Sequence, residues 1–140
     1  MGGRDDPPKP IVMVAPARDL SWAMHVEAGH AIAKTAEASD KRVALIASCD
    51  HGHGHDPKGP YGYTPKSKEF DDQVIALIKR DDLGALLEID PKLPVEGKAD
   101  SYWQMLMLHG ALATGQWKGE FLSYEAPTYF GMLCAAYEPR

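Results

Sequence analysis

The chain has 140 residues, enough for one ordinary globular domain, and its 44% hydrophobic and 25% charged residues are typical of a soluble protein. A formal charge of −5 at pH 7 argues against a surface for nucleic acids or acidic membranes, which need clustered Lys and Arg. No apolar stretch approaches the roughly 20 residues of a membrane span, and the polar start lacks the apolar core of a signal peptide. Because two cysteines are too few for a disulfide framework, we expect a cytoplasmic protein with reduced thiols.

The chain divides into a short lead-in and one predicted domain. Residues 1–10 are rich in proline, glycine and charge, so we expect them to be disordered, with residues 11–140 forming a single α/β domain. Residues 11–15 and 43–48 are predicted strands, because both runs are apolar without polar alternation, as expected when both faces of a sheet are covered. Between them, Ser21 is a predicted helix cap, and apolar residues recur at helical spacing to about Ala38.

A long irregular segment, three helices and two closing strands are predicted for the rest of the chain. Residues 49–65 are rich in Gly, Pro, Tyr and His, and a loop this long is uncommon unless it is functional or disordered. Its aromatic and histidine content argues against disorder. Helices are predicted over residues 66–79, 82–89 and 100–114, and strands over residues 120–124 and 130–137. The expected fold is α/β, with a mixed, mostly parallel sheet that carries helices on its faces and ends in two adjacent strands.

The most informative segment is Ser48-Cys-Asp-His-Gly-His-Gly-His55, here called the histidine loop (residues 48–55). It holds three of the six histidines, and imidazole both titrates near neutral pH and ligates transition metals readily. Glycine lets the backbone approach a ligand closely, and ligands of α/β proteins bind at the carboxyl ends of strands. The loop therefore indicates an active site. We interpret Cys49 within it as a buried structural thiol rather than a nucleophile, because no Cys-His catalytic signature surrounds it.

A carboxylate completes the candidate site. Glu125 ends the apolar run of residues 121–124, and a carboxylate with imidazoles can form the facial triad that holds ferrous iron. The same donors suit zinc-activated hydrolysis. Two arrangements of the loop remain open: His51, His53 and His55 could share a metal if the backbone bends between them, or one imidazole could be catalytic with the others around it.

Four segments together carry a family resemblance: residues 15–22, 39–48, 53–63 and 122–129. They resemble the class III extradiol ring-cleavage dioxygenases, of the protocatechuate-dioxygenase catalytic-subunit type. The match runs in order from about residue 11 to about residue 138 and corresponds to about the carboxyl-terminal half of a complete catalytic subunit.

The resemblance implies roles for individual residues. The family's acid–base histidine lies five residues after the serine that ends a strand, which puts this role on His53, counted from Ser48. A catecholic substrate loses a proton and an oxygen intermediate later gains one, and an imidazole with a pKa of about 6.5 can serve both steps. The family's carboxylate iron ligand corresponds to Glu125. Tyr61 and Tyr63 are candidate substrate-binding residues.

The family's two histidine ligands lie in the other half of the catalytic subunit, so His51 and His55 are candidate replacements. The resemblance implies a ferrous-iron-dependent extradiol dioxygenase that cleaves a catechol-type ring with O2 in aromatic compound catabolism. The expected cofactor is non-haem Fe(II), with Zn(II) or Mn(II) as alternatives. A catalytically inactive metal-binding or protein-interaction module of the same fold is the alternative function, and a zinc hydrolase is a third. We expect a homo-oligomer or a partner chain that supplies the missing half, because unpaired sheet edges and apolar patches drive association.

Overall fold

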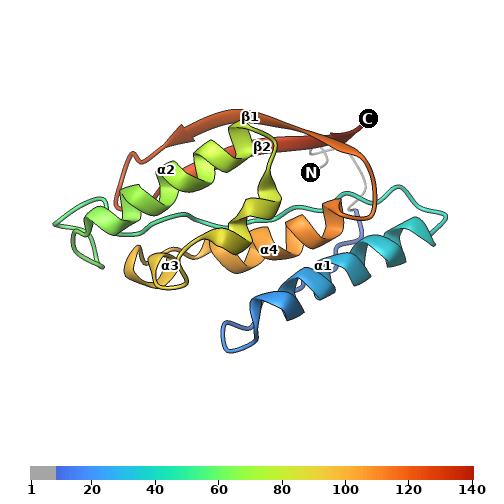
Figure 1. Ribbon diagram of the computed structural model, residues 1–140, viewed down its shortest axis with the longest axis horizontal. Coiled ribbons are helices and arrows are strands. Elements are labelled where there is room, and N and C mark those ends of the chain that lie inside the picture. The colour runs from blue at the N-terminus through green and yellow to red at the C-terminus, as the bar shows by residue number, and fades with distance from the viewer. Residues whose placement is uncertain (1–8) are drawn as a thin grey trace.

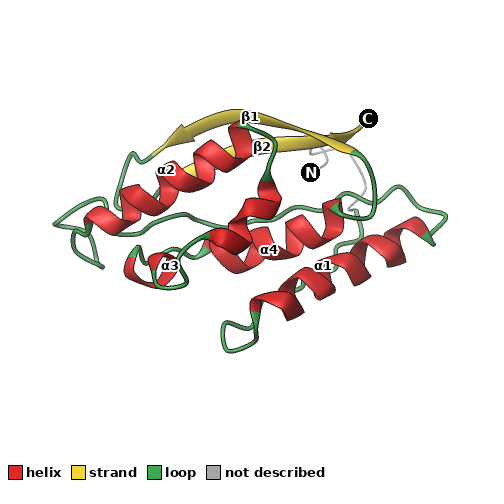
Figure 2. Ribbon diagram, in the orientation of Figure 1, coloured by secondary structure: helices red, strands yellow, loops and turns green. Residues whose placement is uncertain are grey.

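The computed structural model describes residues 9–140, so all but the end of the predicted lead-in lies outside the described residues. Four α-helices, one 3-10 helix and a β-hairpin make up the described part (Figures 1 and 2). None of these helices combines the length and apolar character that crossing a membrane requires. In chain order the elements are α1 (Trp22–Glu37), α2 (Pro65–Lys79), η1 (Leu83–Glu88), α3 (Leu93–Glu96), α4 (Ser101–Leu112), β1 (Trp117–Glu125) and β2 (Met132–Pro139).

Side-chain caps start the two longest helices. The hydroxyl of Ser21 accepts a hydrogen bond from the backbone N–H of Met24 at 3.3 Å, which confirms the predicted start of α1. Thr64 caps α2 in the same way, and Pro65 takes the first helical position, where its missing N–H costs nothing. These local signals start α2 at Pro65, with residues 56–64 between the helix and the segment 48–55.

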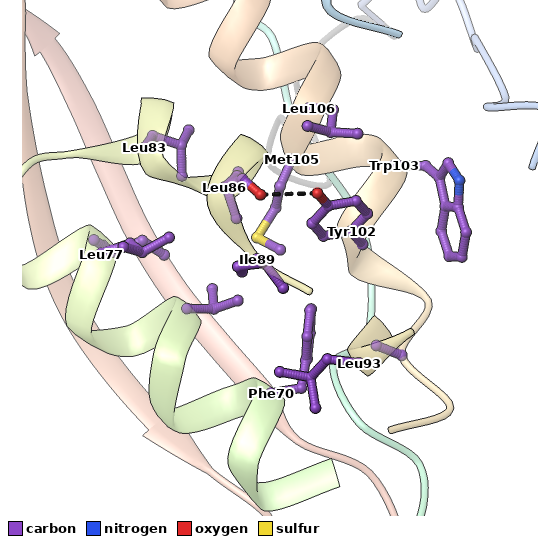
Figure 3. Close-up of a cluster of buried hydrophobic side chains, with 13 residues drawn as sticks. Phe70, Leu77, Leu83, Leu86, Ile89, Leu93, Tyr102, Trp103, Met105 and Leu106 are labelled. Atoms are coloured by element: carbon purple, nitrogen blue, oxygen red, sulfur yellow. Dashed lines mark hydrogen bonds between the residues drawn. The ribbon is translucent and has the colours of Figure 1, made fainter. Parts of the chain in front are cut away.

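The core lies where α2, η1 and α4 meet (Figure 3). Phe70 on α2 and Tyr102 and Leu106 on α4 are fully buried, as is Leu86 on η1. The Tyr102 hydroxyl donates a hydrogen bond to the Leu86 carbonyl at 2.8 Å, which satisfies the one polar atom of this ring, and burial raises the pKa of that hydroxyl. The aromatic and Met-rich helix predicted at residues 100–114 is therefore a core helix.

Helix α1 covers the outer face of α4, and the two helices run in the same direction (Figure 1). Two glycines let their backbones touch. A Cβ atom at Gly29 would overlap the carbonyl oxygen of Met107, and one at Gly110 would overlap the carbonyl oxygen of Val26. The close crossing thus depends on the absence of side chains at these two positions.

The two closing strands form an antiparallel hairpin, with Trp117 opposite Pro139 and Glu125 opposite Met132. Helix α2 packs against β1 (Figure 1). Both strands were predicted, the first with shorter bounds (120–124) and the second displaced by two residues (130–137). The hairpin is the sheet of residues 9–140, so the mostly parallel sheet that we expected is not found there.

The prediction of two strands in the amino-terminal part of the chain is wrong for the described residues. Residues 11–15 and 43–48 form no strand, and all their side chains except the half-buried Ala47 are exposed, with Val12 at 89% and Ile46 at 55%. An apolar run reports which side chains avoid water, but a strand also needs a neighbour for its backbone N–H and C=O groups. Within residues 9–140 these two runs have no such neighbour.

The close crossing of α1 and α4 at Gly29 and Gly110 predicts the effect of a substitution on stability. Gly29→Ala would gain about 1 kcal/mol of helix propensity at an open site, but here the added methyl group must displace the backbone of α4. We expect a net loss of about 1–3 kcal/mol in the free energy of unfolding, measured by urea denaturation. Gly84→Ala is the control, since its Cβ would meet only the tip of the His109 ring, at 3.3 Å. A stabilised Gly29→Ala variant would contradict the prediction.

Candidate active site

The histidine loop lies along the turn that joins β1 to β2, here called the hairpin turn (residues 126–131). The backbone N–H of His51 donates to the Gly131 carbonyl at 2.9 Å, and the N–H of Gly131 donates to the Gly52 carbonyl at 3.0 Å. Farther along, the N–H of His55 donates to the Tyr129 carbonyl at 3.1 Å. Because β1 ends at Glu125, immediately before this turn, the backbone brings the loop and the carboxylate-bearing strand end to one region of the fold.

The glycines of the loop approach α2 closely, whereas we had expected them to make room for a ligand. A Cβ atom at Gly52 would lie 2.6 Å from the Cβ of Ser67, and one at Gly54 would lie 2.8 Å from the Ser67 hydroxyl. The same hydroxyl accepts a hydrogen bond from the Gly54 N–H at 2.8 Å. The loop is therefore held against the start of α2.

One ring nitrogen of His53 is hydrogen-bonded to a backbone carbonyl, and the other is available to accept a proton. Its Nδ1–H donates to the Lys98 carbonyl at 2.9 Å, which leaves Nε2 as the basic nitrogen, 3.7 Å from a carboxylate oxygen of Asp50. The side chain is only 14% exposed. Three aromatic rings surround it, with centroids 5.3 Å away for Tyr61, 5.9 Å for Tyr129 and 5.6 Å for Phe130.

An imidazole with an oriented tautomer in a largely apolar enclosure is suited to proton transfer with an aromatic hydroxyl. Tyr61, predicted as a substrate-binding residue, is one wall of this enclosure, whereas Tyr63 is 63% exposed. Tyr129 and Phe130 were not predicted, because single aromatic residues in a turn carry no pattern. Their place in the hairpin turn beside Glu125 is the signal that could have found them.

His51 is buried, at 3% exposure, and its Nδ1 is hydrogen-bonded to the hydroxyl of Ser101 at 2.7 Å. Burial lowers the pKa of this imidazole, and the carboxylates of Asp71 and Asp50 offset part of that effect. His51 is therefore neutral at pH 7, which is the form that binds metals.

His55 is bound to a buried carboxylate that the sequence analysis missed. Asp71 on α2 is 1% exposed and accepts three hydrogen bonds, from His55 Nε2 at 2.8 Å, from the Gly52 N–H at 2.8 Å and from the Tyr124 hydroxyl at 2.6 Å. Burial, and then Asp71, raise the pKa of Tyr124. The signal for Asp71 was its place on the apolar stripe of α2, one residue after Phe70, since a carboxylate is rarely buried unless it is paired.

The three imidazoles thus have different hydrogen-bonding partners: Ser101, Lys98 and Asp71. Of the two arrangements left open by the sequence, these contacts favour one catalytic imidazole with the others around it. Across residues 9–140, no group of three or more His, Cys, Asp or Glu side chains is placed to hold a metal ion. Cys49, which we predicted to be buried, is half-buried, and burial, and then Asp50, raise the pKa of its thiol to about 12, which disfavours the thiolate that a nucleophile needs.

Comparison with known proteins identifies the family. A model of the catalytic LigB subunit of aromatic ring-opening dioxygenases matches residues 4–132. The chain belongs to the LigB family. Protein CA_C1420 of Clostridium acetobutylicum is 30% identical over 97 residues, which are 69% of this chain and 21% of that protein. The chain therefore spans about a fifth of the length of the curated relative it matches.

Family membership confirms the resemblance on which two site assignments were based. In this LigB-family chain, His53 lies in the aromatic enclosure and Glu125 lies exposed at the end of β1. Their roles as acid–base residue and metal ligand remain predictions, as do those of His51 and His55 as metal ligands and of Tyr61 and Tyr63 as substrate-binding residues.

The Asp71 carboxylate gives the second prediction. Tyr124→Phe removes one of three donors to a buried charge, so we expect the free energy of unfolding to fall by about 1.5–3 kcal/mol in urea denaturation. Tyr63→Phe is the matched control. The Tyr63 side chain is exposed, so loss of its hydroxyl group should change the free energy of unfolding by less than about 0.5 kcal/mol. Equal stability of the two variants would show that the Tyr124–Asp71 bond is unimportant.

Proposed function

We propose that this chain carries the acid–base residue and one metal ligand of an extradiol dioxygenase that opens a catechol-type aromatic ring with O2. The observation that supports it best is the His53 imidazole, whose Nδ1–H is held by a carbonyl while Nε2 remains available inside an aromatic enclosure. Membership of a family of aromatic ring-opening dioxygenases supports the reaction class. Iron as the metal, a catechol as the substrate and extradiol cleavage as the type of ring opening are parts of this proposal.

In this proposal His53 moves one proton in each direction. Nε2 accepts the proton of a substrate hydroxyl, so that the O–H bond breaks as the N–H bond forms, and it returns this proton to an oxygen atom later in the reaction. Asp50, 3.7 Å from Nε2, stabilises the imidazolium in the interval. The surrounding rings of Tyr61, Tyr129 and Phe130 exclude water and offer faces to an aromatic substrate.

The proposed metal ligand is Glu125, with His51 and His55 as further candidates and Fe(II) as the metal, or Zn(II) or Mn(II) in its place. The donor types fit these metals. His51 would offer Nε2 and His55 would offer Nδ1, since their other nitrogens are hydrogen-bonded. Because residues 9–140 do not gather three ligands, the set would be completed from outside these residues. A bound ferrous ion would supply the one-electron chemistry that O2 requires.

Two exposed apolar runs support a second chain as the source of the missing ligands. Residues 11–14 and 43–46 have strand-like sequences but no strand neighbours among residues 9–140, and the second run leads directly into the histidine loop. A strand from a second copy, or from a partner chain, would cover this surface and end beside the loop. The same surface without catalysis would suit the alternative function, an inactive metal-binding or interaction module.

The proposal predicts different defects for its two main residues. His53→Phe should keep the iron content and reduce catechol-dependent O2 uptake roughly 10²–10⁴-fold, the usual contribution of an acid–base residue. Glu125→Gln should lose bound iron and O2 uptake together. Both are measured by metal analysis and by an oxygen electrode, on the assembly in which the protein purifies with added ferrous iron.

His30→Phe and Glu120→Gln are the matched controls, since one lies on α1 and the other in the middle of β1. Unchanged uptake by His53→Phe would refute the catalytic assignment. If the unmutated protein binds iron through Glu125 but takes up no oxygen with any catechol, the inactive metal-binding module is the function.

The exposed runs predict association. At micromolar concentration the protein should sediment as a dimer or larger species, and Val12→Lys with Ile46→Lys should make it monomeric, because charges do not pack in a strand interface. Leu87→Lys is the control, since Leu87 is an isolated exposed apolar residue on η1, outside the two runs. A monomer that binds a hydrophobic dye would indicate a different partner chain, and a monomer that binds none would contradict association.

A further inference from the structure

Lys98 has a backbone conformation that its residue type disfavours. Its φ angle is +53°, in the left-handed region, where a Cβ atom is crowded and glycine is usual. It follows Gly97, the C-cap of α3, and therefore occupies the position where helices most often carry glycine. Residues held in a disfavoured backbone conformation cluster at functional sites, where the conformation contributes to function rather than to stability.

The backbone around Lys98 is fixed from several sides. Its N–H donates to the Val95 carbonyl at 3.0 Å, and the N–H of Ala99 donates to the Pro94 carbonyl at 2.8 Å. The Gly97 carbonyl accepts from the Ser67 hydroxyl at 2.8 Å and from the His53 N–H at 3.3 Å. The left-handed turn thus directs the Lys98 carbonyl at the His53 ring, and that carbonyl accepts the Nδ1–H at 2.9 Å.

The Lys98 side chain reaches a second wall of the same enclosure. Its ammonium group donates a hydrogen bond to the carbonyl of Tyr61. The Tyr61 ring stands edge-on to the His53 imidazole, with centroids 5.3 Å apart and planes at 74°. One residue therefore contacts the imidazole through its carbonyl and anchors, through its ammonium group, the residue that packs against the imidazole from another side.

We propose that Lys98 is a positioning residue for His53: its carbonyl selects the tautomer with hydrogen on Nδ1, and its ammonium group holds Tyr61 against the ring. The inference rests on the proposed function, in which the unprotonated Nε2 receives the substrate proton. It explains why lysine stands where glycine would be the less strained residue. A lysine at this position adds a tie to Tyr61 that glycine cannot make.

The variants Lys98→Gly and Lys98→Arg separate positioning from a purely structural role. Glycine relieves the left-handed backbone, so the midpoint of urea denaturation should stay the same or rise. The tie to Tyr61 is lost, so the contact between the Tyr61 and His53 rings should disappear from NMR spectra. Glycine keeps the backbone carbonyl, so His53 should still carry its hydrogen on Nδ1 in ¹⁵N spectra at about pH 8, where imidazoles are neutral. Arginine keeps a donor and should restore the ring contact.

Lys92→Gly, at the other end of α3, is the control and should leave the His53 and Tyr61 signals unchanged. The inference is overturned if Lys98→Gly retains the contact between the Tyr61 and His53 rings, or if His53 of the unmutated protein carries its hydrogen on Nε2. These readouts need no turnover. A protein that shows the expected shifts but cleaves no ring would keep Lys98 as a positioning residue and overturn the proposed function instead.

Discussion

The buried carboxylate of Asp71 is the interaction on which the arrangement of the site depends. It accepts hydrogen bonds from Gly52 and His55 in the histidine loop and from Tyr124 in β1, while its own backbone belongs to α2. Three segments distant in sequence are therefore joined at one side chain. In a parallel sheet a ladder of backbone hydrogen bonds would place such a loop, but here this charge and the bonds to the hairpin turn do so. A buried carboxylate must be fully hydrogen-bonded, so each of its donors is a constraint on the fold.

The three histidines of the histidine loop differ in protonation and hydrogen bonding because their surroundings differ. Burial and Ser101 keep His51 neutral, Asp71 fixes His55, and only His53 combines an oriented Nδ1–H with an accessible Nε2 and an adjacent carboxylate, Asp50. Partners of the imidazole, rather than the spacing of the histidines, therefore single out the acid–base candidate. His53 is also the residue that the family resemblance selected independently, by its offset from Ser48.

Sequence reasoning predicted the features that depend on local signals and missed those that depend on neighbours. The Ser21 cap, the helix of residues 66–79 and the closing strands follow from spacing and capping within a few residues, and they are confirmed. The parallel sheet is not found in the part of the chain that the structure describes, because apolar runs show a need for burial without showing what buries them. Lys98 could not be predicted either, since its left-handed backbone and its contact with His53 arise only from the fold.

Two incomplete features of the chain share one location. The exposed run at residues 43–46 continues directly into the histidine loop, and the loop region lacks, within residues 9–140, a three-ligand metal site. A strand that paired along this run in the same direction would place its own carboxyl end beside His51 and His55, and the carboxyl ends of strands are where ligands gather in α/β proteins. Covering the apolar surface and completing the metal site would then be a single event. On this argument the proposed association supplies the metal ligands that the proposed function requires, so iron affinity should rise when the protein assembles.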